Sequence, residues 1–233
     1  MFDIRSIVIG TVSMLKKYTC INVTIYEEAN ETDYKNGIMA LPLIGIAIGF
    51  GLFFISFFRY IYDGFFIGAL ALLYYYIITR GVNIKDVYHT LNHYIKPYDT
   101  SENIGGIIGV IIVLLIYYSL FRIVPLTALI IMPSAGFSSL IILSRIITEN
   151  KDNTSILKHC DKYHIISAFF ISFLFTAILN YKLIISLALN YMLITVIVSL
   201  LNKKIESMPP SIEGFIIEAS QILFLTITCL FKL

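Results

Sequence analysis

The run Ile104–Phe121, IGGIIGVIIVLLIYYSLF, holds eighteen consecutive residues without a charged side chain. A helix needs about 20 apolar residues to cross the hydrocarbon core of a membrane. The run is continuous and lacks the alternation of polar and apolar residues that is typical of a barrel strand. It therefore predicts a transmembrane helix, and other long apolar runs follow the same pattern elsewhere in the chain.

Six more apolar runs accompany this one, and together they predict about seven crossings, within a range of six to eight. The predicted crossings are Ile38–Phe58, Ile61–Thr79, Ile104–Phe121, Ile123–Leu143, His164–Leu179, Leu183–Leu201 and Gly214–Phe231. Pro125 and Pro133 fall inside one run, which membrane bundles tolerate because neighbouring groups satisfy the freed carbonyls. The predicted fold class is an all-α polytopic transmembrane helix bundle, with residues 1–233 forming a single integral membrane domain.

The composition agrees with a membrane protein whose surroundings are lipid. Of the 233 residues, 58% are hydrophobic and 14% are charged, whereas an average soluble domain has about 25% charged residues. The net charge of +2 is too small to predict a nucleic-acid partner. Cys20, Cys160 and Cys229 show no CxxC spacing, so we expect isolated thiols rather than a disulfide framework or a zinc site.

Basic residues are distributed unequally between the two sides of the predicted bundle. With seven crossings, all the long polar segments fall on one side, namely 1–37, 80–103, 144–163 and 202–213. They contain thirteen of the Lys and Arg residues, and the other side has four. The positive-inside rule therefore predicts a multi-pass protein of the cell membrane with a cytoplasmic N-terminus and cytoplasmic long loops. Within the N-terminal segment, Met1–Lys17 fits an amphipathic helix that lies on the membrane or packs against the bundle.

Two motif-like segments come first along the chain. Tyr34–Phe50, YKNGIMALPLIGIAIGF, contains Leu-Pro-Leu-Ile-Gly and a further glycine, Gly49, four residues after Gly45. It is similar to the start of the cobalamin synthase family, the adenosylcobinamide-GDP ribazoletransferases. Gly81–Asn92, GVNIKDVYHTLN, stands where that family has Gly-x-His-Leu-Asp-Gly-x-x-Asp-x-x-Asp. The three aspartate positions are occupied here by Lys85, His89 and Asn92.

Two further segments follow in the family's order. Asp99–Gly106 stands where the family has Asp-Ser-Arg-x-Gly-Thr-x-Gly, and it keeps Asp99 and Gly106 but not the arginine. Pro209–Gln221 stands where the family has Thr-Gly-Asp-x-x-Gly-x-x-x-Glu-x-x-Glu. It keeps Gly214 and Glu218, whereas Ser211 and Gln221 replace the Asp and the second Glu. The resemblance covers nearly the whole chain in order and spacing, although no single motif is intact.

The resemblance implies a membrane enzyme that joins adenosylcobinamide-GDP to α-ribazole, or to its 5′-phosphate, and releases GMP. It implies corrinoid and nucleotide substrates, other cobalamin-assembly proteins as partners, and Mg²⁺ as the cofactor. Phosphoryl transfer from a diphosphate is assisted by a hard cation, and carboxylates bind Mg²⁺ well. Aspartates spaced four and three residues apart lie on one helical face, which accounts for the family's second motif.

The candidate site residues follow from this correspondence. Lys85, His89, Asn92 and Glu218 occupy catalytic positions; Asp99, Glu102, Gly106 and Gly214 are candidates for substrate binding. One cation and two neutral groups at 85, 89 and 92 bind Mg²⁺ poorly, so Asp99 and Glu102 are the candidate metal ligands. Lys85 is suited to contacting a phosphate. Asp86, His89 and His93 also share a face, which suits either a transition metal or a solvated surface.

Other readings of these residues stay open. Asp99 and Glu102 also fit a polar cluster that caps the following helix. Glu218 lies about one turn inside the last run, where an unpaired carboxylate is unfavourable unless it reaches the interface. Tyr74–Tyr76 fit an aromatic belt at the membrane surface.

Two alternatives to the transferase remain at the level of the whole protein. The loss of the three aspartates favours a catalytically inactive relative that binds corrinoid or an assembly partner. Buried polar residues around a central cavity would instead favour a small unrelated transporter.

Overall fold

The computed structural model describes residues 4–24, 26, 29–95, 104–147, 155–204 and 209–233, with only the backbone described at 203 and 204. Within these residues the regular elements are all helices. Six helical segments are long and apolar enough to cross a membrane, and a bent pair of helices brings the number to seven if it forms one span. The predicted fold class, an all-α polytopic membrane bundle, is confirmed.

The long helices match the predicted crossings closely. They are α3 (Leu41–Phe57), α6 (Ile104–Ile123), α7 (Leu126–Leu143), α9 (Lys162–Asn180), α10 (Leu183–Lys204) and α11 (Ile212–Phe231). The second predicted crossing, Ile61–Thr79, contains the shorter α4 (Gly64–Ile78). Asp63 caps the N-terminus of α4, because its carboxylate accepts hydrogen bonds from the backbone of Phe65 and Phe66. The remaining elements are α1 (Ile4–Tyr18), α2 (Glu31–Gly37), η1 (Ile38–Ala40), η2 (Phe58–Tyr60), α5 (Val82–Tyr94) and α8 (Ile156–His159).

Helix α7 forms the centre of the bundle, and it packs against α3, α9 and α11. Two glycines let α3 approach it closely, because a Cβ atom at Gly45 would lie only 2.5 Å from the backbone nitrogen of Ser134, and Gly49 is equally crowded by Ile130. Close backbone approach through small residues is the usual way that helices associate in lipid. Gly45 and Gly49 of the first motif therefore serve the packing of the bundle.

Small polar side chains fill the contacts of α7 with α9, α10 and α11. We call this set the serine seam; it consists of Ser134, Ser138, Ser139, Ser172, Asn190 and Ser220, all of which are fully buried. Ser138 and Ser172 are 2.5 Å apart, Ser139 and Ser220 are 2.6 Å apart, and the Asn190 amide donates to Ser220 at 2.9 Å. The hydroxyls and the Asn190 amide N–H bond to one another in the contacts between helices, whereas Oδ1 of Asn190 has no hydrogen-bond partner among the described residues.

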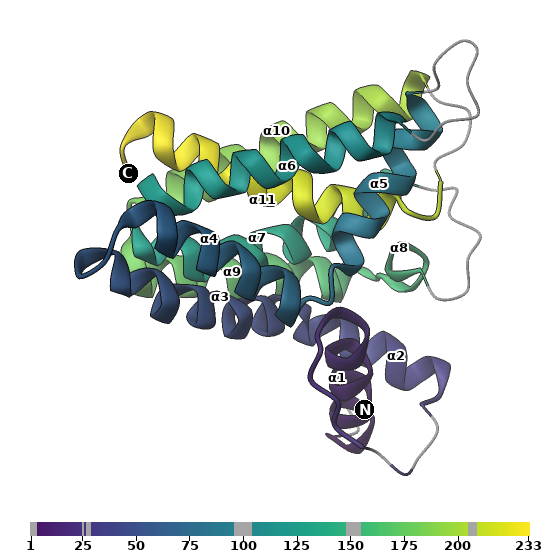
Figure 1. The fold of residues 1–233 in the computed structure, drawn as a ribbon. Helices are drawn as coiled ribbons and strands as arrows, with labels where there is room; N and C mark the ends of the chain where they lie inside the picture. The colour runs from purple at the N-terminus through teal and green to yellow at the C-terminus, as the bar shows by residue number, and fades with distance from the viewer. Residues whose placement is uncertain (1–3, 25, 27–28, 96–103, 148–154, 205–208) are drawn as a thin grey trace.

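The two ends of the bundle differ (Figure 1). Helices α5 and α8 lie at one end, together with the beginnings of α6 and α11, while η2 and the C-terminus lie at the other. This places the flanks of all four long polar segments at the same end, as the predicted number of crossings requires.

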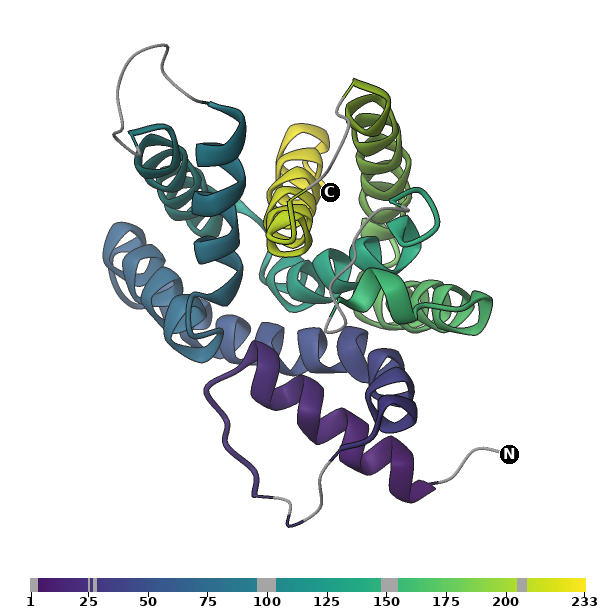
Figure 2. The ribbon, with the colours of Figure 1, turned by 90° about the vertical axis from the view of Figure 1, so that its right-hand side faces the viewer.

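Helix α1 runs across the direction of the long helices at that end of the bundle (Figures 1 and 2). It packs on α2 through Gly10 and Gly37, where neither glycine has space for a side chain. Its buried residues include Ser6, Ile9 and Met14, whereas Ile4 and Val8 are 78% and 55% exposed. The predicted amphipathic helix is therefore present, and it packs through a face different from the Ile4 and Val8 edge.

Candidate functional site

A sharp bend between α4 and α5 positions the candidate site. Arg80 and Gly81 both have left-handed backbone conformations, with φ of 54° and 59°, and the two helices meet at 89°. Glycine adopts this conformation without strain, whereas an arginine does so at some cost. As a result, α5 leaves the direction of the long helices and lies against α6 and α11.

The inner face of α5 packs against the beginning of α11. A Cβ atom at Gly214 would lie 2.5 Å from Oδ2 of Asp86 and 2.9 Å from Cα of Asn83, so only glycine fits there. The Asp86 carboxylate accepts a hydrogen bond from the backbone N–H of Gly214. The hydroxyls of Thr90 and Ser211 are 2.8 Å apart, one turn further along α5.

A second face of α5 contacts the beginning of α6. The backbone N–H of Gly106 donates to Oδ1 of Asn92 at 2.7 Å, and a Cβ atom at Gly106 would meet the backbone of Tyr88 at 2.6 Å. Gly106 and Gly214 were predicted as substrate-binding residues, and in the fold each makes room for α5. The second, third and fourth motif segments thus meet at this helix, although more than a hundred residues of sequence separate the fourth segment from the other two.

The predicted catalytic positions on α5 lie on its outer side. Lys85 and His89 are exposed, and Asn92 is half-buried through its bond to Gly106. The Mg²⁺ implied by the resemblance does not fit these three residues, since none carries a carboxylate. In the part of the chain that the structure describes, no three His, Cys, Asp or Glu side chains gather into a metal-binding group. The other candidate ligands, Asp99 and Glu102, lie outside the described residues.

Glu218, the remaining catalytic candidate, lies at the centre of a buried hydrogen-bond network. Tyr117 donates to its Oε2 at 2.6 Å and Tyr75 to its Oε1 at 3.0 Å. Both hydroxyls also lie within reach of Oε1 of Gln221, at 3.0 Å and 2.5 Å. The side chain of Asn83 adds a hydrogen bond to Glu218. We call Tyr75, Asn83, Tyr117, Glu218 and Gln221 the tyrosine–glutamate network; it joins α4, α5, α6 and α11.

The network corrects one prediction from the sequence and adds a residue that it missed. Tyr75 is fully buried, so it does not belong to the aromatic belt that the Tyr74–Tyr76 run suggested. Successive residues of a helix point about 100° apart, and this spacing directs the middle tyrosine inward. Tyr117 carried no motif signal, although a tyrosine inside an otherwise apolar crossing could have marked it as the partner of a buried polar group.

Two carboxylates lie next to each other where α5 meets α11. The pKa of Asp86 is raised to about 6, chiefly by burial; the hydrogen bond from Gly214 lowers it, and the neighbouring charge of Glu213 adds to the rise. Glu213 accepts hydrogen bonds from Ser155 Oγ at 2.5 Å and Leu157 N at 3.2 Å, and Lys17 Nζ is 3.9 Å away. Glu213 therefore ties α1 and α8 to α11, whereas Asp86 has a pKa that is raised toward physiological pH.

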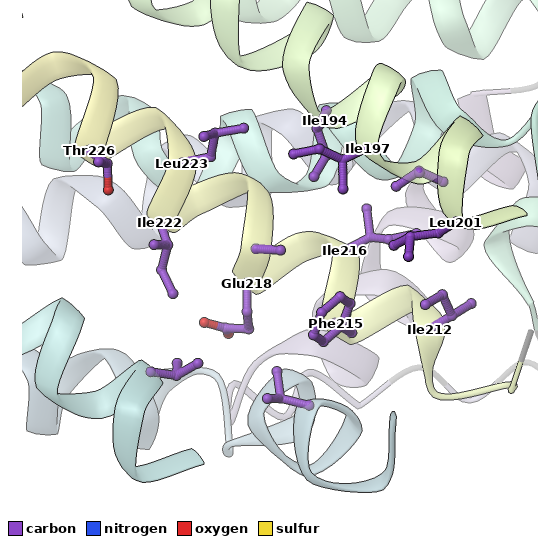
Figure 3. A pocket seen from close by; sticks show the side chains of 14 residues that line it. Ile194, Ile197, Leu201, Ile212, Phe215, Ile216, Glu218, Ile222, Leu223 and Thr226 are labelled. Carbon is purple, nitrogen blue, oxygen red and sulfur yellow. The ribbon is translucent and has the colours of Figure 1, made fainter. Parts of the chain in front are cut away.

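A cavity of about 380 Å³ lies beside the network, between α10 and α11. Figure 3 shows Ile194, Ile197 and Leu201 of α10 facing residues of α11. Val87 of α5 and Val113 of α6 complete the wall, and the polar residues of the lining are Glu218 and Thr226. The buried polar groups of the serine seam do not line this cavity, whereas Glu218 of the tyrosine–glutamate network does.

Comparison with known proteins adds no further constraint: no family model, curated protein or solved structure matches this chain.

Proposed function

We propose that this chain is a membrane transferase of the ribazoletransferase type, with its reaction site where α5, α6 and α11 meet. The observation that carries the proposal is the meeting of three motif segments around α5. Asn92 accepts a hydrogen bond from the backbone of Gly106, and Asp86 accepts one from the backbone of Gly214. Asn83, on the same helix, is hydrogen-bonded to Glu218. Segments that resemble one family's motifs thus share one location, as residues that handle a common substrate must.

The residues present suit particular parts of that reaction. Transfer to the ribazole hydroxyl requires a group that accepts its proton. Asp86 of α5 is half-buried against the first turn of α11. Its pKa of about 6 leaves it mostly ionised at neutral pH and able to take up a proton. Lys85 is exposed on the same helix and can bind a phosphate as a point charge. The hydrogen bonds of the tyrosine–glutamate network link α4, α5, α6 and α11 and so fix the position of the helix that carries these residues.

The proposal includes an orientation. The thirteen Lys and Arg residues on the long segments, against four on the other side, favour a cytoplasmic position for α5 and for the start of α11. Native Cys20 is exposed at this end, and Tyr181 is 70% exposed in the connection between α9 and α10. With Cys160 and Cys229 changed to Ser, an impermeant thiol reagent added to intact cells should spare Cys20. The reagent should label a Tyr181→Cys variant that lacks Cys20, and the reverse pattern would overturn the orientation.

Complementation tests the activity. The chain is expressed in a strain that lacks its cobalamin synthase, and the strain is fed cobinamide and lower base. We expect the unmodified chain and His93→Ala, an exposed change on the same helix, to restore cobalamin-dependent growth, and Asp86→Ala to fail at equal membrane abundance. If the unmodified chain accumulates in the membrane and does not restore growth, the transferase proposal is wrong.

An inactive relative is the second candidate, and the outer face of α5 favours it. The three aspartate positions of the family hold Lys85, His89 and Asn92, and Asn92 is already engaged by Gly106. Such a protein would bind corrinoid without turning it over. Equilibrium binding of cobinamide to the purified protein, in the absence of complementation, would select this candidate over the transferase.

A further inference from the structure

We propose that the cavity between α10 and α11 is a binding site for one acyl chain of a bilayer lipid. The cavity has a volume of about 380 Å³, which falls within the range of ligand pockets, about 300–1,000 Å³. This site is distinct from the transferase chemistry proposed above, and it does not depend on that chemistry.

The shape of the cavity matches an extended chain. Its lining residues on α11 run from Ile212 to Thr226, a rise of about 21 Å at ~1.5 Å per residue. One leaflet contributes about half of the ~30 Å hydrocarbon thickness. Figure 3 shows Ile212 and Leu201 at one end of the cavity and Thr226 at the other, so the cavity extends along α11 from its interfacial end. The cavity is thus longer than one leaflet is thick, and a chain that enters at the level of the headgroups can lie in it for the whole ~15 Å depth of its leaflet.

The lining of the cavity favours a hydrocarbon ligand over a polar one. Twelve of the fourteen lining residues are apolar, with Glu218 and Thr226 as the other two. The carboxylate oxygens of Glu218 are already engaged by Tyr75 and Tyr117. A polar group placed in the cavity would lose its hydration with little to replace it. The hydroxyls of Thr90 and Ser211 are 2.8 Å apart at the interfacial end of α11, where a headgroup would be.

The position of the cavity indicates that the acyl chain comes from the bilayer. Apart from Val87 of α5, its walls belong to helices that are long and apolar enough to cross a membrane. Figure 2 shows α11 set between α10 and the pair α5 and α6. Ile197 and Leu201 line the cavity and are still 44% and 36% exposed, and Ile107 and Ile108 of α6 are about half exposed. The apolar surface is thus continuous from the cavity to the outside of the bundle, and a lipid chain reaches it without crossing water.

The chain contains no tryptophan, which allows a direct test with single-tryptophan variants. Phe215→Trp places the reporter in the cavity lining. Phe170→Trp places it at a position that is 65% exposed on α9, and Phe137→Trp at one that is fully buried in α7. Each variant is reconstituted in vesicles of phosphatidylcholine with brominated acyl chains, which quench tryptophan fluorescence on contact. The proteins are then transferred into detergent and purified again.

In vesicles we expect strong quenching at 215 and 170 and little at 137. After transfer to detergent, quenching at 170 should disappear, whereas more than half of that at 215 should remain because the bound lipid is retained. A second change, Ala219→Phe, fills the cavity and should remove the retained quenching. Loss of quenching at 215 as complete as at 170 would overturn the proposal, as would an absence of quenching at 215 in vesicles, which is the outcome if a second copy of the chain covers the cavity.

Discussion

The tyrosine–glutamate network and the serine seam are both buried, polar and hydrogen-bonded, but they differ in the groups that they contain. The seam consists of small neutral side chains that bridge α7 to α9, α10 and α11. The network surrounds an ionisable carboxylate with two tyrosine hydroxyls and two amide side chains. Small neutral groups allow helices to approach closely in lipid, whereas an intramembrane carboxylate is expensive to keep and is usually functional.

The buried carboxylate makes the network, rather than the neutral seam, the better candidate for a functional region. The seam lies in contacts between helices and away from the cavity, and it can be explained by packing alone. The network lies between the cavity and the junction of α5 with α11, and Glu218 belongs to both the network and the cavity lining.

The largest effect is expected at Glu218. Glu218→Ala removes the acceptor of Tyr75 and Tyr117 and opens space beside the cavity, which should lower the free energy of unfolding by about 3 kcal/mol. Glu218→Gln keeps an acceptor oxygen and the volume, so it should lose less than half as much stability while still abolishing complementation. Thermal unfolding in detergent and growth assays measure the two effects. Equal destabilisation by Ala and Gln would show that the carboxylate itself is required for folding.

The next effect is expected where the serine seam meets α3. A methyl group at Gly45 would collide with the backbone at Ser134, so Gly45→Ala should destabilise the bundle by about 1–3 kcal/mol. Gly64→Ala is the matched control, because nothing lies near a Cβ atom there. Unfolding midpoints of the two variants in the same detergent give the comparison. A Gly45 variant as stable as the Gly64 variant would mean that α3 and α7 are less closely packed.

A smaller, pH-dependent effect is expected at Asp86. Its pKa is raised to about 6 in the folded protein, so between pH 4 and 6 the folded state binds more protons than the unfolded state. Stability contributed by Asp86 therefore falls as pH rises through this window and stays low above it. Asp86→Asn should be more stable than the unmodified protein at pH 7.5 by about 1 kcal/mol, after allowance for solvent screening.

Unfolding midpoints of the Asp86 pair, measured from pH 4.5 to 8, should converge toward the acid end. A constant difference across the range would show that the carboxylate is not the cause. Glu213→Gln serves as a comparison, because Glu213 is the neighbouring carboxylate and is bound by Ser155 and Leu157.

The smallest effect is expected within the serine seam. Ser139→Ala removes one hydroxyl from the pair with Ser220, but the Asn190 amide still donates to Ser220. Hydrogen bonds between membrane helices contribute about 0.6 kcal/mol on average, and the variant should lose about that much and keep full complementation. If Ser139→Ala abolished complementation without unfolding the protein, the seam would have to be treated as part of the functional site.

The apolar runs predicted the bundle well, because the requirement for about 20 apolar residues leaves few alternatives. The run 104–121 corresponds to α6, and the run 123–143 to α7, which begins three residues later because Pro125 precedes its first turn. The run 61–79 was predicted as an ordinary crossing, but hydropathy does not register the cap at Asp63 or the left-handed pair Arg80 and Gly81 that shorten α4.

Less of the candidate site than of the fold could be predicted from the sequence. Motif spacing led to Glu218, Gly106 and Gly214, and the structure shows each of them near α5 or in the network. Spacing also led to Lys85 and His89 as site positions, which lie exposed on the outer side of the helix, while Asp86 lies on the inner side. Which face of a short helix turns inward depends on the helices that cover it, and those helices come from distant parts of the chain.

The shortness of α4 has a consequence for the membrane around the protein. Fifteen residues span only about 22 Å, whereas the hydrocarbon core of a typical bilayer is about 30 Å thick. Phe65, Phe66, Leu73 and Ile77 are exposed on this helix and must meet lipid. If α4 crosses the membrane, a thinner bilayer beside it removes the mismatch, which costs a fraction of a kcal/mol for each Å. This side of the bundle should therefore favour short-chain lipids and thin membranes, and the bend that positions α5 also makes the protein sensitive to the thickness of its bilayer.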